Sequence, residues 1–200
     1  MMLDRCYVIV DSAAWLSRLL PLGVKLVQLR VKDRPIAEVR AEIAIAKALC
    51  PDAGACLVIN DYWQCALDEE CDFVHLGQTD LDAADVPALK KAGIRIGIST
   101  HSHAELDRAL ALEPDYVALG PIYPTVLKAM PWAPQGLERI TEWKRLIAPI
   151  PLVAIGGLTV ERLPKVFEAG ADSAAVVTDI LRHPDPDART REWLASTRER

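Results

Sequence analysis

Eight short apolar runs, several of them rich in β-branched residues, recur along this 200-residue chain at near-regular intervals. Several runs are apolar at successive positions, as a parallel strand buried on both faces requires, and do not alternate with polar residues. The sequence therefore predicts eight strands. Their ranges are Tyr7–Val10, Leu26–Leu29, Leu57–Ile59, Phe73–Leu76, Ile94–Ile98, Tyr116–Leu119, Leu152–Ile155 and Ala174–Val177.

Helical patterns fill the gaps between these runs. Over residues 36–46 the apolar side chains fall three and four positions apart, which predicts an amphipathic helix. Ser102 and Glu105 have the spacing of a capping box and predict the start of another helix. Two further helices are predicted over Asp85–Ala92 and Val160–Ala169, because each range is followed by a glycine suited to a left-handed C-terminal cap.

Alternation of strands and helices favours a parallel α/β fold. Eight such units without a break in composition favour a compact (βα)8 TIM barrel, with residues 1–200 forming a single domain. An open flavodoxin-like sheet would need only about five strands. The composition, 51% hydrophobic and 26% charged, is typical of a globular domain with one core.

Charge and composition exclude several classes of partner. The net charge is -5 and no helix face collects Lys and Arg, so no nucleic acid partner is expected. The N-terminal apolar run, flanked by Asp4 and Asp11, is too short for a signal peptide or membrane span, so we expect a cytoplasmic protein without a membrane partner. The five cysteines lack C-x-x-C spacing and are interpreted as reduced, core-filling thiols. A homo-oligomer is compatible with the sequence, which does not fix the oligomeric state.

Polar residues follow most of the predicted strands. In a TIM barrel the functional groups lie at the C-terminal ends of the strands and in the loops that follow, so these residues are expected to meet at one end of the barrel. They are Gln28, Arg30 and Lys32 after the second strand, Asn60 and Asp61 after the third, Asp80 after the fourth, Ser99 at the fifth, Thr125 and Lys128 after the sixth, Gly157 after the seventh, and Val177 and Thr178 at the eighth.

The glycine pair Gly156-Gly157 directly follows the seventh strand. Glycines there let backbone N–H groups approach a ligand closely, and barrels of this kind commonly hold a phosphate at this place. A tight turn without a ligand is the alternative interpretation.

Cations and carboxylates are expected at the same rim. Arg30, Lys32 and Lys128 together with Asp61 and Asp80 suit a polyphosphate held by Mg²⁺, which takes one or two protein carboxylates and fills its other positions with phosphate oxygens and water. Salt bridges among the same side chains are the alternative, although they would explain no particular placement.

Residues 121–135 form a long connection with four prolines and no regular period. Tyr123, Met130 and Trp132 are costly to expose, which favours a lid over the barrel end; a proline-stiffened surface loop is the alternative. His75 and His101 have the chemistry of acid/base groups but could equally bond a neighbouring turn, and neither is assigned a catalytic role.

The strand-end motifs resemble those of the thiamine phosphate synthase family. The motifs, in family order and spacing from about Tyr7 to Ile180, are VQLRVK, VINDY, VHLGQTDL, GISTH, LGPIYPT followed by Lys128, PLVAIGGL and EAGADSAAVVTDI. The resemblance implies a (βα)8 barrel that joins hydroxymethylpyrimidine diphosphate to a thiazole phosphate with Mg²⁺ as cofactor, giving thiamine phosphate and diphosphate. It also implies that diphosphate leaves first and the thiazole nitrogen captures the resulting pyrimidine cation, which requires no protein nucleophile.

The resemblance assigns a role to each matching position. Arg30, Lys32 and Lys128 would stabilise the departing diphosphate, and Asp61 and Asp80 would bind the metal. The pyrimidine diphosphate would be bound by Gln28, Arg30, Lys32, Asn60, Ser99 and Lys128. The thiazole phosphate would be held by Thr125, Gly157, Val177 and Thr178.

The chain departs from the family pattern at a few positions. Leu127 replaces a usual Thr, so one hydroxyl contact to the thiazole phosphate is missing, and Tyr62 replaces a usual Arg. Beyond Lys128 the usual charged stretch is replaced by residues 129–132, Ala-Met-Pro-Trp.

Two alternative functions remain open. The sister thiazole tautomerase group has a His where this chain has Pro121, and it tends to lack the second metal carboxylate, whereas Asp80 is present here. A non-catalytic barrel that binds a phosphorylated ligand is the other alternative, for which Leu127 and Tyr62 would be the first signs.

Overall fold

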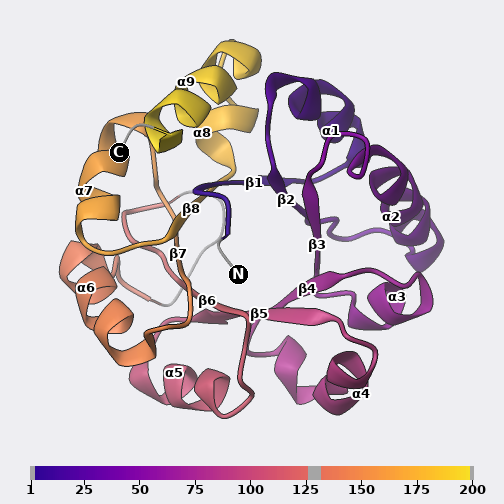
Figure 1. The fold of residues 1–200 in the computed structure, drawn as a ribbon, viewed down its shortest axis with the longest axis horizontal. Coiled ribbons are helices and arrows are strands. Elements are labelled where there is room, and N and C mark those ends of the chain that lie inside the picture. The colour runs from indigo at the N-terminus through magenta and orange to yellow at the C-terminus, as the bar shows by residue number, and fades with distance from the viewer. Residues whose placement is uncertain (1–2, 126–131, 199–200) are drawn as a thin grey trace.

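The computed structural model describes residues 3–125 and 132–198 of the chain. Within them eight parallel strands form a closed barrel in chain order, and the pairing of β1 with β8 completes the ring (Figure 1). The predicted TIM barrel is therefore confirmed. The strands are β1 (Cys6–Val10), β2 (Leu26–Leu29), β3 (Cys56–Asn60), β4 (Phe73–Leu76), β5 (Arg95–Thr100), β6 (Tyr116–Leu119), β7 (Leu152–Ile155) and β8 (Ser173–Val176).

Helices surround the barrel on its outside (Figure 1). They are α1 (Ala13–Leu19), α2 (Ile36–Leu49), α3 (Trp63–Asp68), α4 (Val86–Lys91), α5 (His103–Leu110), α6 (Gly136–Ile147), α7 (Leu163–Glu168), α8 (Thr178–Leu181) and α9 (Pro186–Arg198), with short 3₁₀ helices η1 (Leu20–Leu22), η2 (Asp80–Asp82) and η3 (Val160–Arg162). Strands β1, β2, β4, β6 and β8 are buried at every position, because the helices cover the outer face and side chains fill the interior.

The predicted helix boundaries are partly right. The helix α4 begins after Asp85, whose side chain accepts a hydrogen bond from the N–H of Ala88 at 2.9 Å. The Ser102 hydroxyl accepts from the N–H of Glu105 at 3.3 Å, as the capping box predicts. The helix predicted over residues 160–169 is found in two parts, η3 and then α7, since Pro164 lacks the N–H that a continuous α-helix would use; Gly170 follows with a φ of 109°, as predicted for the C-terminal cap.

Alternate side chains of each strand point into the barrel. Tyr7 and Ile9 of β1 belong to the interior cluster, whereas Cys6, Val8 and Val10 pack against the helices. The interior holds a large aromatic ring because β5 has Gly97 beside it, where an added Cβ would lie 2.1 Å from the ring of Tyr116.

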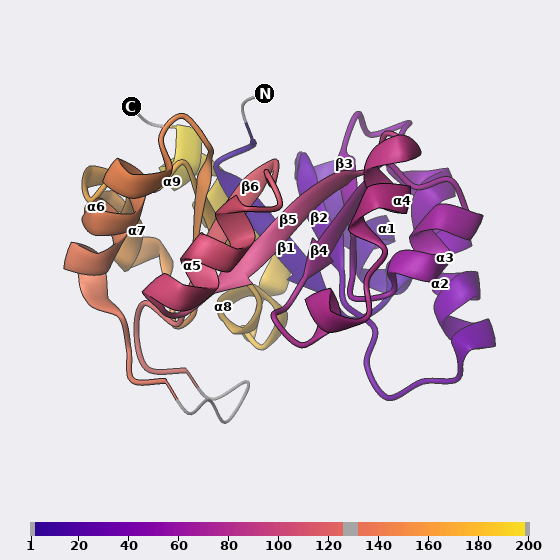
Figure 2. The same ribbon diagram turned by 90° about the horizontal axis from the view of Figure 1, so that it is seen from below.

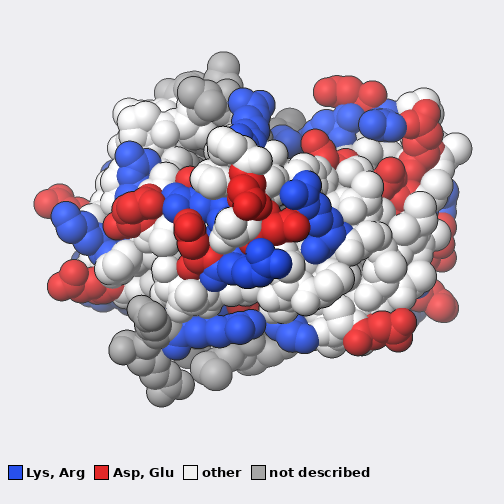
Figure 3. All heavy atoms as spheres, turned by 90° about the horizontal axis from the view of Figure 1, so that it is seen from above, with Lys and Arg blue, Asp and Glu red and all other residues white. Residues whose placement is uncertain are grey.

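The two ends of the barrel differ. The connections from β2 to α2 and from β6 to α6 lie at the end where the strands finish, which we call the mouth, while β1 begins and α9 ends at the opposite end (Figure 2). On the face around α1 and α9, acidic and basic side chains are intermingled (Figure 3). Among the residues that the structure describes, no helix has the length and apolar character needed to cross a bilayer.

Candidate active site

The mouth of the barrel contains a cavity of about 400 Å³ to which all eight strands or their following loops contribute. The structure thus brings the predicted site residues together, although what each one binds stays a prediction. Lys128 lies outside the described residues. The others that line this cavity are Gln28, Arg30, Lys32, Asn60, Asp61, Asp80, Ser99, Thr125, Gly157, Val177 and Thr178.

Two carboxylates meet at one side of the cavity. Asp61 adopts a left-handed backbone conformation with φ of 63°, and its carboxylate pairs with the ammonium group of Lys32. Asp80 accepts a hydrogen bond from the N–H of Gly77 at 3.2 Å. Burial and the neighbouring Asp61 carboxylate raise the pKa of Asp80.

This pair fits a hard divalent cation. In the described part of the chain, no three His, Cys, Asp or Glu side chains gather closely enough to hold a metal by themselves. Two adjacent carboxylates are nevertheless the protein ligands that Mg²⁺ commonly uses when a substrate phosphate supplies the rest. A cation between Asp61 and Asp80 would also offset their mutual repulsion.

Asn60 supplies a second indication of a polar binding site. Its side chain is buried and lines the cavity, and its Nδ2 has no hydrogen-bond partner among the residues that the structure describes. An unsatisfied buried amide donor costs about 1–3 kcal/mol. An acceptor atom on a bound molecule would remove this cost, so Asn60 is suited to contact a polar ligand.

A chain of hydrogen bonds crosses the barrel interior and lines the cavity. Gln28 Nε2 donates to Tyr7 Oη at 2.9 Å, and Tyr7 Oη lies 2.9 Å from Tyr116 Oη. His75 Nδ1 lies 2.7 Å from Tyr116 Oη, and its Nε2 lies 2.8 Å from Ser99 Oγ. Burial lowers the pKa of His75 to about 4, so its ring is neutral near pH 7. We call these five residues the interior chain.

Sequence reasoning did not identify the middle of the interior chain. His75 bonds two interior side chains and not a neighbouring turn, and Tyr7 and Tyr116 were treated as members of apolar runs. The two-residue period of a strand could have found them, since Tyr7 and Tyr116 occupy inward positions.

The other histidine considered from the sequence, His101, lies at the edge of the cavity. Its Nδ1 is 2.8 Å from Glu105 Oε2, and its ring stacks on Trp132 with centroids 5.8 Å apart. The Glu105 carboxylate also accepts a hydrogen bond from the backbone N–H of His101 at 2.6 Å. In a capping box it would instead accept from the backbone N–H of the N-cap residue, Ser102. The pairing holds His101 beside the described end of the 121–135 connection.

That connection is fixed to the loop after β7. The N–H of Ile122 donates to the carbonyl of Ile155 at 2.9 Å, and the N–H of Tyr123 donates to the carbonyl of Gly156 at 3.0 Å. Thr125 and Trp132 both line the cavity. Residues 126–131, including Met130 and Leu127, lie outside the described residues, so the lid stays a prediction.

The glycine pair is required by this contact. Gly156 and Gly157 have φ of 98° and 65°, and a Cβ on Gly157 would lie 2.5 Å from the carbonyl oxygen of Pro124. The pair therefore forms a tight turn under the neighbouring loop and also lines the cavity. Forming this turn is compatible with binding a phosphate there.

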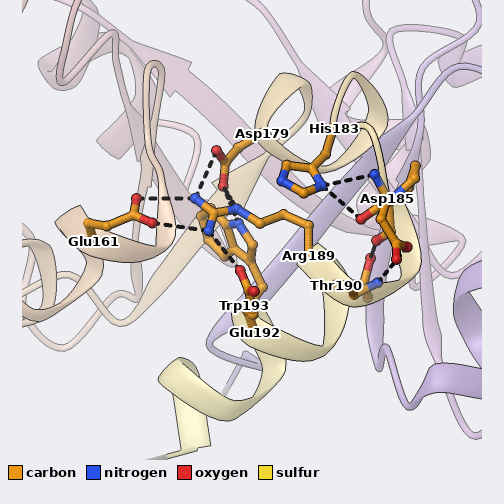
Figure 4. A network of polar contacts seen from close by, with 10 residues as sticks. Glu161, Asp179, His183, Asp185, Arg189, Thr190, Glu192 and Trp193 are labelled. Carbon is orange, nitrogen blue, oxygen red and sulfur yellow. Dashed lines mark hydrogen bonds and ion pairs between the residues drawn. The ribbon is translucent and has the colours of Figure 1, made fainter.

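The segment after β8 is held by an ion-pair network centred on the largely buried Arg189 (Figure 4). Arg189 of α9 makes two hydrogen bonds to Asp179, at 2.8 and 3.1 Å, and two to Glu161, at 3.0 and 3.1 Å. Trp193 Nε1 donates to Asp179 at 2.7 Å. Asp179 follows Thr178 directly, so this network fixes one wall of the cavity from outside the barrel.

The cysteines are not placed for catalysis. All five are free, and burial raises the pKa of each thiol, to about 12 for Cys6 and about 11 for Cys50 and Cys71. None of the five lines the cavity. The prediction that they fill the core is therefore confirmed.

Comparisons with known proteins agree with this geometry. The model of a family described as thiamine monophosphate synthase matches residues 6–180. Thiamine-phosphate synthase of Rhizobium etli is 64% identical over 197 residues, covering 98% of this chain and 97% of that protein. Thiamine-phosphate synthase of Cronobacter sakazakii is 47% identical over 188 residues, covering 94% and 90%.

Solved structures show the same fold. The structure of thiamine phosphate pyrophosphorylase from Pyrococcus furiosus superimposes with a TM-score of 0.86 at 26% identity, over 97% of this chain and 95% of that one. A 3-hexulose-6-phosphate synthase superimposes with a TM-score of 0.71 at 19% identity, over 96% and 99%. The second likeness concerns the barrel alone.

Proposed function

The chain belongs to the thiamine monophosphate synthase family, and from that premise we propose that it is an enzyme joining hydroxymethylpyrimidine diphosphate to thiazole phosphate. The products are thiamine phosphate and diphosphate. The observation that carries this proposal is the meeting, in one cavity, of cations, an adjacent carboxylate pair and the unpartnered Asn60 amide. These groups are what a substrate with a diphosphate and a polar ring requires.

The pyrimidine diphosphate occupies the side of the cavity formed by β2 to β5. Gln28, Asn60 and Ser99 come from inward strand positions and bind the ring, since the buried Nδ2 of Asn60 needs an acceptor. Arg30 and Lys32 follow β2 and bind the diphosphate, with Lys128 as a third cation. Guanidinium and ammonium groups hold phosphate oxygens by charge-assisted hydrogen bonds.

Asp61 and Asp80 hold Mg²⁺ in this proposal. When bound, the ion supplies positive charge to the diphosphate oxygens as negative charge develops on them. Lys32 pairs with Asp61, so its ammonium group would lie near a diphosphate bound beside these carboxylates.

The thiazole phosphate occupies the opposite side of the cavity. Gly157, Val177, Thr178 and Thr125 line it, and backbone N–H groups next to glycine can approach phosphate oxygens closely. The Arg189 network behind Thr178 keeps this wall in place.

The reaction breaks the bond from the pyrimidine methylene carbon to the diphosphate oxygen and forms a bond from that carbon to the thiazole nitrogen. No protein nucleophile is needed, in agreement with five thiols that lie outside the cavity. The protein stabilises the departing diphosphate with Arg30, Lys32 and Lys128. It also keeps water from the carbon cation by holding both substrates in a cavity enclosed by the barrel, with the 121–135 segment as its cover.

The decisive test measures thiamine phosphate formed from the two substrates while Mg²⁺ is titrated. The wild-type protein should form product only with metal, and Asp80→Asn should lower product formation by at least about 100-fold. The matched control is Asp82→Asn in the same 3₁₀ helix, whose side chain is 69% exposed and pairs with Arg108; it should leave activity unchanged.

A second readout does not depend on turnover. Mg²⁺ with diphosphate should raise the melting temperature of the wild-type protein and of Asp82→Asn, but not of Asp80→Asn. Condensation without metal, or no condensation at all, would contradict the proposal. A thiazole tautomerase would convert its thiazole substrate without forming thiamine phosphate, and a binding protein would form neither product.

Three further properties stay predictions. They are the dependence on Mg²⁺, the cytoplasmic location, and an assembly of identical copies.

A further inference from the structure

The interior chain links two residues that the proposed function assigns to the pyrimidine. Gln28 and Ser99 stand at its ends, on β2 and β5, and both line the cavity. Its middle members are Tyr7, Tyr116 and His75, which are 1%, 0% and 8% exposed. Tyr7, Tyr116 and His75 also line the cavity, but because they are almost completely buried, we expect each hydroxyl and imidazole group to find its hydrogen-bond partners within the interior chain.

This requirement fixes the donor-to-acceptor direction of the hydrogen bonds along the interior chain. A hydroxyl has one hydrogen, and a neutral imidazole has one donor and one acceptor nitrogen. Tyr7 accepts from Gln28 Nε2, so its own hydrogen must go to Tyr116. The hydrogen of Tyr116 then goes to His75 Nδ1, and His75 donates from Nε2 to Ser99 Oγ. The hydrogen of Ser99 remains for a ligand.

The opposite direction would change what the cavity offers. If the Oε1 and Nε2 atoms of Gln28 exchanged places, donor and acceptor would be exchanged in every hydrogen bond of the interior chain. The hydroxyl of Ser99 would then donate to His75. Ser99 would then present only an acceptor to the ligand. A mixed arrangement would leave one buried donor without an acceptor, which is unfavourable. The chain therefore has two self-consistent states, and the amide of Gln28 selects between them.

We propose that Tyr116 and His75 are positioning residues that make Ser99 a hydrogen-bond donor to a ring nitrogen of the pyrimidine. This inference rests on the proposed function. Neither residue needs to touch the reacting atoms, because they act through the hydroxyl of Ser99. In the same direction the Oε1 atom of Gln28 remains an acceptor. The interior chain therefore offers the ligand an acceptor at Gln28 and a donor at Ser99.

Such an arrangement selects the chemical form of the ring. Where the pyrimidine ring carries an amino group, the ring nitrogen beside it has a lone pair and accepts from Ser99. In the corresponding oxo-pyrimidine that nitrogen carries a hydrogen, so two donors would face each other. A site built to hydrogen-bond one form rejects the other because polar groups are left unpaired. The interior chain is thus a specificity element for aminopyrimidines.

The variant that tests this is Tyr116→Phe, which keeps the ring and removes only the hydroxyl. We expect kcat/KM for the pyrimidine diphosphate to fall about 10- to 100-fold, while KM for the thiazole phosphate stays unchanged. Preference for the amino substrate over its oxo analogue, measured by competitive inhibition, should fall at least about tenfold.

The matched control is Phe73→Leu. Phe73 packs edge-on against the same Tyr116 ring, with centroids 5.5 Å apart, and takes no part in the hydrogen bonds. This variant should lower the melting temperature and leave the preference for the amino form intact. An equal loss of preference in both variants would mean that Tyr116 acts through packing, and the inference would be overturned.

A direct measurement needs no variant. Long-range ¹H–¹⁵N correlation spectra of the wild-type protein should show His75 with its hydrogen on Nε2; a hydrogen on Nδ1 would reverse the chain and overturn the inference. If the wild-type protein forms no thiamine phosphate, the proposed function fails while the spectra still report the direction. If it forms thiamine phosphate and Tyr116→Phe keeps the amino preference, the inference alone fails.

Discussion

At the scale of single residues, Gly157 joins the proposed phosphate site to the loop above it. A side chain there would require a left-handed backbone and would meet the Pro124 carbonyl oxygen at 2.5 Å. We predict that Gly157→Ala raises KM for the thiazole phosphate about 10- to 100-fold, because a small displacement of the loop misplaces the substrate. It should also lower the free energy of unfolding by about 3 kcal/mol.

Gly93 provides the control for this prediction. It also has a positive φ, of 76°, but an added Cβ would meet nothing within 4 Å. Gly93→Ala should therefore cost only about 1–2 kcal/mol of stability, which is the backbone penalty alone, and leave KM unchanged. Steady-state kinetics and denaturant unfolding of both variants check this, and equal effects would contradict the role given to Gly157.

Individual site residues were predictable where a polar residue interrupts an apolar pattern. Asn60 and Asp61 directly follow a strand, so their place at the mouth could be read from the sequence. Tyr7 and Tyr116 could not be singled out in the same way, because a tyrosine in an apolar run looks like a core residue. Their partnership depends on β1, β4 and β6 meeting across a closed barrel, which no local pattern encodes.

At the scale of elements, the short helix α8 depends on α9 for its position. Arg189 is only 11% exposed and Asp179 only 15%, so removing the cation would leave a largely buried carboxylate without the charge of Arg189, although Trp193 would still donate to it. We predict that Arg189→Met lowers the free energy of unfolding by about 2–3 kcal/mol and raises KM for the thiazole phosphate more than KM for the pyrimidine diphosphate. Thermal unfolding and kinetics with each substrate varied in turn measure both effects; equal changes in the two KM values would argue against a local role.

Glu161, which also accepts hydrogen bonds from Arg189, has a lowered pKa. Hydrogen bonds from Arg189 lower the pKa of Glu161 from 4.5 to about 2. A carboxyl group with a lowered folded pKa stabilises the fold above its unfolded pKa of 4.5, and this contribution is lost as the pH falls through 2. Because Glu161 is 68% exposed, solvent screens the contribution strongly and it should be small.

We therefore expect Glu161→Gln to be slightly less stable than the wild type at neutral pH. The difference should shrink as the pH drops below 4.5 and vanish near 2. Melting temperatures over this range test the expectation, and a difference that grows on acidification would show that the sign is wrong.

Elements were predictable to the extent that local signals mark their ends. All eight strands were found because continuous apolar runs and the turn residues between them are local features. The helix predicted over residues 160–169 is divided into η3 and α7, since Pro164 lies in the first turn of α7 while the apolar spacing continues without interruption. The helices α8 and α9 were not delimited, as their contact through Arg189 and Asp179 is a tertiary interaction.

At the scale of the whole molecule, the closed barrel protects its thiols. The cysteines lie in the first half of the chain, and burial raises the pKa of every one. We predict that a disulfide reagent modifies the native protein slowly at neutral pH and modifies all five thiols together once the barrel unfolds. Labelling rates followed across a denaturant titration test this. Rapid labelling of any one cysteine in native conditions would indicate that part of the barrel opens separately.

The hydrogen bonds from Ile122 and Tyr123 to the strand β7 loop have a consequence for how this protein can change. They anchor the start of the long connection independently of whatever follows Thr125. If the proposed lid exists, substitutions farther along that connection would change how the cavity is covered while these two hydrogen bonds keep the glycine turn in place. The proposed phosphate site and the proposed cover could then change separately.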